Sequence, residues 1–176
     1  MTNNDILRRI RYIFDFSDTQ VISIFATADC TVSREQISDW LKKDDDAAYK
    51  EITDVLFATF LNGLINTKRG KKEGEQPKPE TELNYNIIFR KLKIALNLQA
   101  EGILEILERS DFMMSKHELS ALFRKAGHKN YRPCKEQVLR LFLNGLQMKY
   151  RPPSDKEESS DTEESSEKTG FNPWLK

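Results

Sequence analysis

An internal duplication constrains the fold of this chain more than any other feature. A shift of 82 positions aligns residues 4–64 with residues 86–146 without a gap, and Phe60-Leu-Asn-Gly-Leu64 then coincides with Phe142-Leu-Asn-Gly-Leu146. Five consecutive identities at a single offset are hard to obtain by chance. Because self-similarity at a fixed offset indicates a repeated structural unit, we expect two copies of one fold.

The spacing of apolar residues indicates that each copy is helical. Copy one begins with Ile6, Leu7 and Ile10, which recur at the three- and four-residue intervals of an amphipathic helix. Copy two is apolar at the same positions, and three further segments of each copy repeat the pattern. The sequence therefore predicts an all-α protein built by tandem duplication of a four-helix module.

Polar residues mark the start of the third helix in both copies. Ser33 with Gln36, and Ser115 with Glu118, have the spacing of a capping box. In such a box a hydroxyl and the side chain three residues later each satisfy an exposed backbone amide. We therefore expect the same helix boundary in both copies.

Composition shifts divide the chain into four parts. We expect helical modules over residues 1–69 and 84–150, a charged Gly/Pro linker over 70–83, and an acidic, Ser-rich, disordered tail over 151–176. A unit of about 65 residues buries only a modest core on its own. We therefore expect the two modules to dock on each other with pseudo-two-fold symmetry.

The net charge of zero conceals a basic second module. Residues 84–151 carry thirteen Lys/Arg and six Asp/Glu, and the second and third helices of each copy have helix-turn-helix proportions. Five side chains of copy two are the candidates for contact with nucleic acid: Lys116, Arg124, Lys125, Arg90 and Lys91. The alternatives are ordinary helix pairing with a solvated outer face, or a basic surface that lies against acidic parts of the same chain.

Reactive side chains are not grouped in a pattern typical of catalysis or metal binding. His117-Glu118 lacks the second histidine, at Ala121, that a zinc helix needs, and phosphate-cradling glycine motifs are absent. Cys30 and Cys134 align with apolar residues of the other copy, which favours buried core thiols. Basic neighbours of Cys134 leave an activated thiol as the second interpretation. We expect no enzyme activity, no metal site and no cofactor.

A repeated Asn-Gly pair is the most pointed polar feature that the two copies share. Asn62, Gly63, Asn144 and Gly145 lie inside otherwise apolar stretches. In one interpretation the glycine lets two helices approach closely or ends a helix, while the asparagine caps or bonds a neighbouring backbone. In the other, the pairs form a pseudo-symmetric polar notch where the modules meet.

The tail ends in Phe171, Trp174 and Leu175, which are apolar residues at the end of a polar tether. This pattern is typical of a short docking motif, although a frayed chain end would look the same. One surface that such a motif could meet is the basic face of copy two.

Three segments resemble the bacterial YehS family of uncharacterised proteins. They are Asn3-Asn-Asp-Ile-Leu-Arg-Arg-Ile-Arg-Tyr12, Val32-Ser-Arg-Glu-Gln-Ile-Ser-Asp-Trp-Leu-Lys42 and the repeated Phe-Leu-Asn-Gly-Leu. The likeness spans about residues 1–150 and implies a bacterial, cytoplasmic protein of two helical modules. The family has no established activity, so the resemblance implies no functional residue. The acidic tail departs from the compact pattern of the family.

These observations favour a non-enzymatic module that presents a pseudo-two-fold groove to a protein partner. The alternative is nucleic-acid binding through the basic surface of copy two, which should weaken steeply with salt. No uninterrupted apolar stretch predicts a membrane helix, and the amino terminus lacks the basic and then apolar order of a signal peptide. We therefore expect a cytoplasmic protein without a membrane partner.

Overall fold

The computed structural model describes residues 1–154. Within this range the chain forms eight α-helices and no strand. The helices are α1 (Asn3–Phe14), α2 (Asp18–Thr27), α3 (Arg34–Leu41), α4 (Asp54–Arg69), α5 (Tyr85–Ala95), α6 (Ala100–Glu108), α7 (Lys116–Phe123) and α8 (Glu136–Tyr150). The prediction of an all-α fold with four helices in each copy is confirmed.

The third helix of each copy begins where the sequence predicts. Ser33 Oγ accepts a hydrogen bond of 3.1 Å from the N–H of Gln36, and Gln36 Oε1 accepts one of 2.9 Å from the N–H of Ser33. Ser115 and Glu118 form the same box, at 3.1 and 2.8 Å. These paired bonds satisfy amides that the first helical turn leaves exposed.

The turns between helices are duplicated as well. Asp15 and Asn97 follow the first helix of their copies with φ of 53° and 52°, and Asp29 and Asp111 follow the second with 57° and 54°. The left-handed region is costly for most residues but is tolerated by Asp and Asn. Both copies therefore use the same backbone geometry at the same positions.

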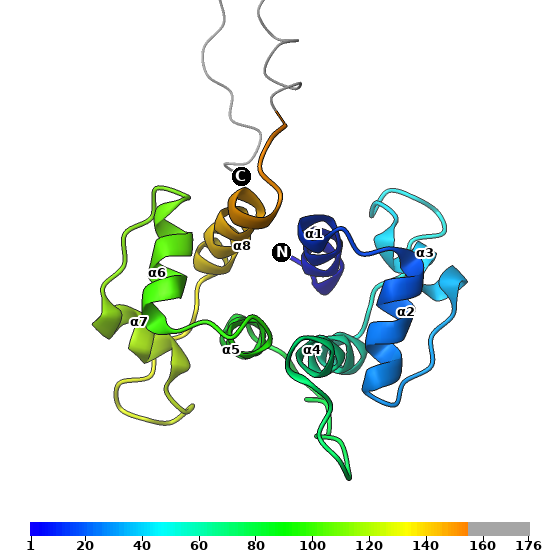
Figure 1. Ribbon diagram of the computed structural model, residues 1–176, viewed down its shortest axis with the longest axis horizontal. Coiled ribbons are helices and arrows are strands. Elements are labelled where there is room, and N and C mark those ends of the chain that lie inside the picture. Colours follow the sequence, from blue (N-terminus) through cyan, green and yellow to red (C-terminus); the bar gives the residue numbers. More distant parts are fainter. Residues whose placement is uncertain (155–176) are drawn as a thin grey trace, which may run out of the picture.

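Four helices, α1, α4, α5 and α8, stand at the centre of the molecule and are seen nearly end-on in Figure 1, with α2 and α3 on one flank and α6 and α7 on the other. Their N-termini meet at one end. Asn3 Nδ2 lies 2.7 Å from Asp54 Oδ1, Asp54 Oδ2 accepts a 2.9 Å hydrogen bond from the N–H of Leu83, and the Tyr85 hydroxyl donates to Glu136 at 3.2 Å. These contacts link the starts of all four helices.

The C-termini of the central helices meet at the opposite end. The rings of Phe14 in α1 and Tyr150 in α8 lie 5.2 Å apart, and the ammonium of Lys68 in α4 lies 5.0 Å from the centre of the Phe14 ring. The central helices are therefore parallel. Because α4 and α5 point the same way, the linker over 70–83 must return along the length of the helices.

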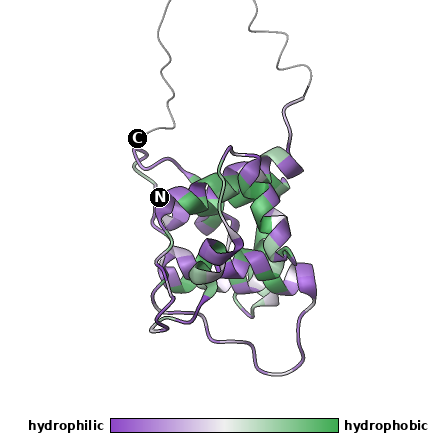
Figure 2. Ribbon diagram, turned by 90° about the vertical axis from the view of Figure 1, so that its left-hand side faces the viewer, coloured by the Kyte–Doolittle hydropathy of each residue, from purple (hydrophilic) through white to green (hydrophobic). Residues whose placement is uncertain are grey.

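The two modules share one core. Buried apolar side chains from both copies form a single contiguous cluster, in which Phe25, Phe57, Phe60, Phe89 and Phe142 are fully enclosed. Figure 2 shows hydrophobic and hydrophilic residues alternating along the helices, as in amphipathic helices that turn one face inward. The modules are docked through α4 against α5 and α1 against α8, pairs that the shift of 82 exchanges.

Within residues 1–154 no helix combines the length and the apolar character needed to cross a membrane.

Candidate functional site

The glycines of the repeated Asn-Gly pairs lie where two helices of one module cross. A side-chain carbon added to Gly63 would lie 2.8 Å from the carbonyl carbon of Ile24 in α2, and one added to Gly145 would lie 2.8 Å from that of Ile106 in α6. Both glycines lie inside helices that continue beyond them. Close helix approach is therefore the role that the structure gives them.

The asparagines of the same pairs lie at the interface between the modules. Asn62 Oδ1 accepts a 2.6 Å hydrogen bond from Lys91 Nζ, and Asn144 Oδ1 accepts one from the guanidinium of Arg9. The shift of 82 exchanges these two bonds, because it relates Arg9 to Lys91 and Asn62 to Asn144. Lys91 also lies 3.0 Å from Glu80 in the linker. Each Asn-Gly pair thus joins a helix crossing to a contact between modules.

The basic residues proposed to contact nucleic acid are not equally available. Lys91 is 12% exposed and engaged in the module interface. Arg90 donates to the carbonyl groups of Phe123 and Arg124 at 3.2 and 3.3 Å, so it caps the end of α7. Lys116 is exposed but lies 2.5 Å from Glu101. These three side chains already have partners within the chain.

Arg124 and Lys125 are exposed and begin a loop that we name the basic loop, residues 124–135. This loop contains five Lys/Arg and no Asp/Glu, whereas the equivalent residues 42–53 of copy one contain three Lys and four Asp/Glu. The duplication therefore preserved the fold of this loop and reversed its charge. Among the described residues 1–154, neither Arg124 nor Lys125 has an ion-pair partner, so of the candidate residues these two can meet an anionic ligand.

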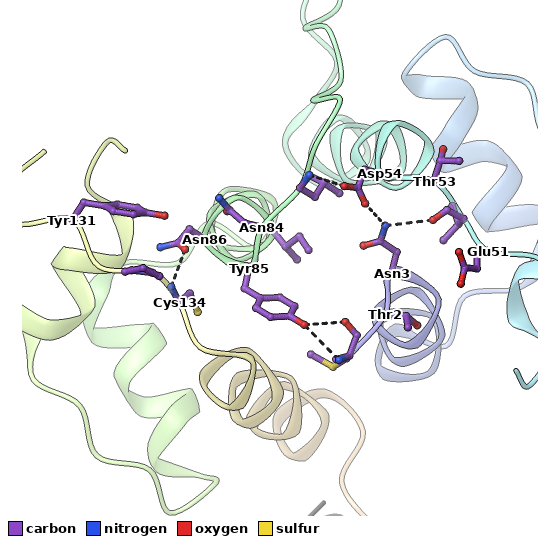
Figure 3. A pocket seen from close by; sticks show the side chains of 15 residues that line it. Thr2, Asn3, Glu51, Thr53, Asp54, Asn84, Tyr85, Asn86, Tyr131 and Cys134 are labelled. Atoms are coloured by element: carbon purple, nitrogen blue, oxygen red, sulfur yellow. Dashed lines mark hydrogen bonds between the residues drawn. The ribbon is translucent and has the colours of Figure 1, made fainter. Parts of the chain in front are cut away.

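A pocket of about 570 Å³ opens where the N-termini of α1, α4, α5 and α8 meet (Figure 3). Its lining includes five pairs of residues that the shift of 82 relates. The pairs are Met1 and Leu83, Thr2 and Asn84, Asn3 and Tyr85, Glu51 and Pro133, and Ile52 and Cys134. The pocket therefore straddles the pseudo-two-fold axis, and neither module could form it alone.

Polar groups beside the pocket are held by bonds within the protein. Glu136 Oε2 lies 2.7 Å from the amino group of Met1, and this hydrogen bond is the main cause that lowers the pKa of Glu136. Burial, and then the charge of Glu136, raise the pKa of the Tyr85 hydroxyl. Both oxygens of Asp54 accept hydrogen bonds, from Asn3 and Leu83. The lining carboxylate of Asp54 and the neighbouring Glu136 thus serve as structural acceptors.

The two thiols are buried to different degrees. Cys134 is 6% exposed, and burial raises the pKa of its thiol to about 11. Burial also raises the pKa of the half-buried Cys30. A thiol whose pKa is raised is protonated at neutral pH and is a poor nucleophile, so the core-filling interpretation fits both residues better than the activated thiol.

Two buried asparagines were missed as functional positions by the sequence analysis. Asn86 Nδ2 donates to the carbonyl groups of Leu122 and Arg132, both at 2.9 Å, and its Oδ1 accepts from the N–H of Cys134 at 2.8 Å. Asn4 makes the equivalent three bonds in copy one. The sequence feature that could have indicated them is an asparagine that occurs at the same position of both copies, next to apolar helix residues. These side chains fix the loops that form the pocket walls.

Other predicted site residues lie apart from the pocket or outside the described range. His117 and His128 are exposed. Among residues 1–154, no group of three His, Cys, Asp or Glu side chains is placed to hold a metal ion. The proposed docking residues Phe171, Trp174 and Leu175 lie outside the described residues.

Comparison with known proteins agrees with the duplicated architecture. The model of a family described as a protein of unknown function (DUF1456) matches the chain twice, over residues 3–70 and 85–151. The chain is 42% identical to the uncharacterized protein YehS of Escherichia coli (strain K12) over 147 residues, which cover 83% of this chain and 94% of the relative. No solved structure shows a significant match. The resemblance seen in the sequence is confirmed, and the chain belongs to the DUF1456 family, of which each of its two modules is one matched unit.

Proposed function

We propose that this chain is a non-enzymatic binding protein that holds a segment of a partner protein in the pocket between its modules. The observation that carries the proposal is the composition of the pocket lining, in which equivalent residues of both copies face one cavity. A docked pair of modules therefore provides a site that a single module lacks.

The chemistry of the pocket suits a peptide segment with one apolar side chain. Ile52, Ile88 and Cys134 are buried residues of the lining and offer an apolar floor, whereas Thr2 and Asn84 are exposed polar residues. A volume of about 570 Å³ falls in the range of roughly 300–1,000 Å³ typical of ligand pockets. An apolar anchor surrounded by polar contacts is a usual arrangement in protein recognition.

The state of the polar groups supports binding rather than catalysis. A general acid or base works best with a pKa near the working pH, and a nucleophile needs activation. Glu136 instead has a lowered pKa and is paired, while the pKa of the Cys134 thiol is raised to about 11. The polar groups around the pocket are therefore suited to keeping the pocket in one shape.

The pocket can be tested by obstructing it. A Glu51→Trp variant places a large ring at the exposed rim, and Glu75→Trp in the linker adds the same ring away from the pocket. Peptides selected from a random library on the full chain should bind the wild type and Glu75→Trp but lose affinity for Glu51→Trp. They should also shift the amide NMR signals of Thr2 and Asn84. Peptides or lysate proteins that bind both variants equally would count against the proposal.

The basic loop supports nucleic-acid binding as a second candidate. Its five Lys/Arg are exposed, and within the loop no Asp/Glu offsets them. Phosphate contacts would make affinity fall steeply as salt rises. Binding of single- and double-stranded DNA and RNA at low salt should then weaken in an Arg124→Glu/Lys125→Glu variant, whereas titrations without binding at low salt would remove this candidate.

A further inference from the structure

The C-terminal end of the central helices carries a second charged surface, which neither proposal above uses. We name it the basic pole and define it by Lys68, Arg69, Lys93 and Lys149. Among residues 1–154, no carboxylate lies within ion-pair distance of any of these four side chains. The negative ends of four parallel helix dipoles offset part of this charge. The remaining ammonium and guanidinium groups can still meet an anionic ligand.

Aromatic rings lie among the charges of the basic pole. The Lys68 ammonium lies 5.0 Å from the centre of the Phe14 ring and 5.7 Å from that of Phe16, and the Lys149 ammonium lies 5.5 Å from that of Tyr150. Tyr150 remains 44% exposed. A surface that alternates cations and rings can bind carboxylates and aromatic side chains of one ligand.

A hollow of about 230 Å³ lies between the C-terminal ends of α4 and α5. It is lined by Arg69, Lys93, Ile94, Asn97 and Leu98. Ile94 is 46% exposed, which leaves a large aliphatic side chain uncovered between two cations. The hollow therefore fits an apolar or aromatic side chain that carries acidic neighbours in its sequence.

We propose that the chain's own tail, residues 155–176, docks on the basic pole, with Trp174 or Phe171 in the hollow and the tail carboxylates on Lys68, Arg69 and Lys149. The tail contains seven Asp/Glu and three Lys before and around its apolar end. It therefore carries both of the features that the pole can bind. In this arrangement the tail competes with any external acidic partner of the pole.

The point at which the tail leaves the fold favours the pole over the basic loop. Helix α8 ends at Tyr150. Lys149 is one of the four residues of the basic pole, and Tyr150 is one of the rings that lie among its charges. The basic loop precedes α8, and a helix of 15 residues separates the two surfaces by about 22 Å at 1.5 Å per residue. The first carboxylates of the tail, Asp155, Glu157 and Glu158, follow Tyr150 within eight residues, so only a short tether joins them to the pole.

The tail tryptophan provides a direct test in the full-length chain. Trp40→Phe leaves Trp174 as the single tryptophan, and circular dichroism checks that this core change keeps the helices. At low salt we expect Trp174 emission to be blue-shifted and protected from acrylamide, and high salt should remove much of the protection because it screens exposed ion pairs. Arg69→Glu/Lys149→Glu should also remove it, whereas the control Lys125→Glu/Lys129→Glu in the basic loop should not.

A second measurement needs no change in the core. In the full chain, Phe171→Ala/Trp174→Ala should shift the amide NMR signals of Ile94, Asn97 and Leu98 and leave those of the basic loop in place. Trp174 emission that is typical of a solvent-exposed ring and is unchanged in the Arg69→Glu/Lys149→Glu variant would overturn the proposal. Sensitivity to the basic-loop variants instead would also overturn it, because the tail would then occupy the other surface.

Discussion

Lys91 of α5 donates a hydrogen bond of 2.6 Å to Asn62 of α4, and the same bond recurs between Arg9 of α1 and Asn144 of α8. One pair of positions in the repeated unit therefore supplies two symmetry-related polar contacts between the modules. Burial lowers the pKa of Arg9, and the nearby charge of Arg140 lowers it further. The bond to Asn144 is thus made in a partly desolvated interface, where a missing partner would be costly.

Lys91→Met tests the contribution of this bond to docking. The variant keeps an unbranched side chain but leaves Asn62 without its donor and Glu80 without its ion-pair partner, and the loss of a buried hydrogen-bond partner costs about 1–3 kcal/mol. We expect the free energy of unfolding in urea to fall by this amount. Lys72→Met, in the exposed linker, is the matched control and should change stability by less than about 0.5 kcal/mol. Equal effects in both variants would contradict a structural role for the bond.

Gly63→Ala and Gly102→Ala should change stability in opposite directions. A methyl group at Gly63 would overlap the backbone of Ile24, and such overpacking costs about 1–3 kcal/mol or more. At Gly102 in α6 the closest atom would be Leu98 Cδ2 at 3.5 Å, an ordinary contact. There alanine should stabilise the helix by about 0.5–1 kcal/mol. Thermal or urea unfolding of the two variants measures these changes. A Gly63→Ala protein as stable as the wild type would contradict the close approach of α2 and α4.

The duplication made much of the fold predictable from sequence. Helix content, the capping boxes at Ser33 and Ser115, and the existence of two equivalent modules all follow from local patterns that occur twice. Local patterns do not encode the direction in which modules pack. The parallel arrangement of the central helices, and with it the long path of the linker, could be known only from the three-dimensional structure.

The candidate site was less predictable because it depends on contacts between distant segments. The Asn-Gly pairs were recognised, yet Lys91, the partner of Asn62, was interpreted as a candidate for contact with nucleic acid. The pocket at the pseudo-two-fold axis brings together residues from the starts of four helices, and its position requires the docking geometry. The spacing of residues in the sequence does not predict that docking geometry.

Asn86→Ala should destabilise the second module strongly. The substitution leaves the carbonyl groups of Leu122 and Arg132 and the N–H of Cys134 without their side-chain partner. Each unsatisfied buried group costs about 1–3 kcal/mol, so we expect a combined loss above about 3 kcal/mol. Asn130→Ala in the exposed basic loop should stay within about 0.5 kcal/mol of the wild type. A small effect of Asn86→Ala in urea unfolding would show that water or loop movement replaces the three bonds.

The buried thiol of Cys134 predicts a loss of stability at alkaline pH. Burial raises its pKa from an ordinary value of 9.0 to about 11, so above pH 9 the unfolded chain ionises while the folded chain retains the proton. The contribution of the protonated thiol to the free energy of unfolding is fully present below pH 9 and is lost as pH rises towards 11. The slope of this loss is at most about 1.4 kcal/mol per pH unit. Cys134→Val, which imitates the apolar Ile52 of copy one, removes this proton and should lose less stability over the same window. Urea unfolding of both proteins between pH 8 and pH 11 under reducing conditions measures the difference, and parallel pH profiles would mean that the thiol ionises freely in the folded state.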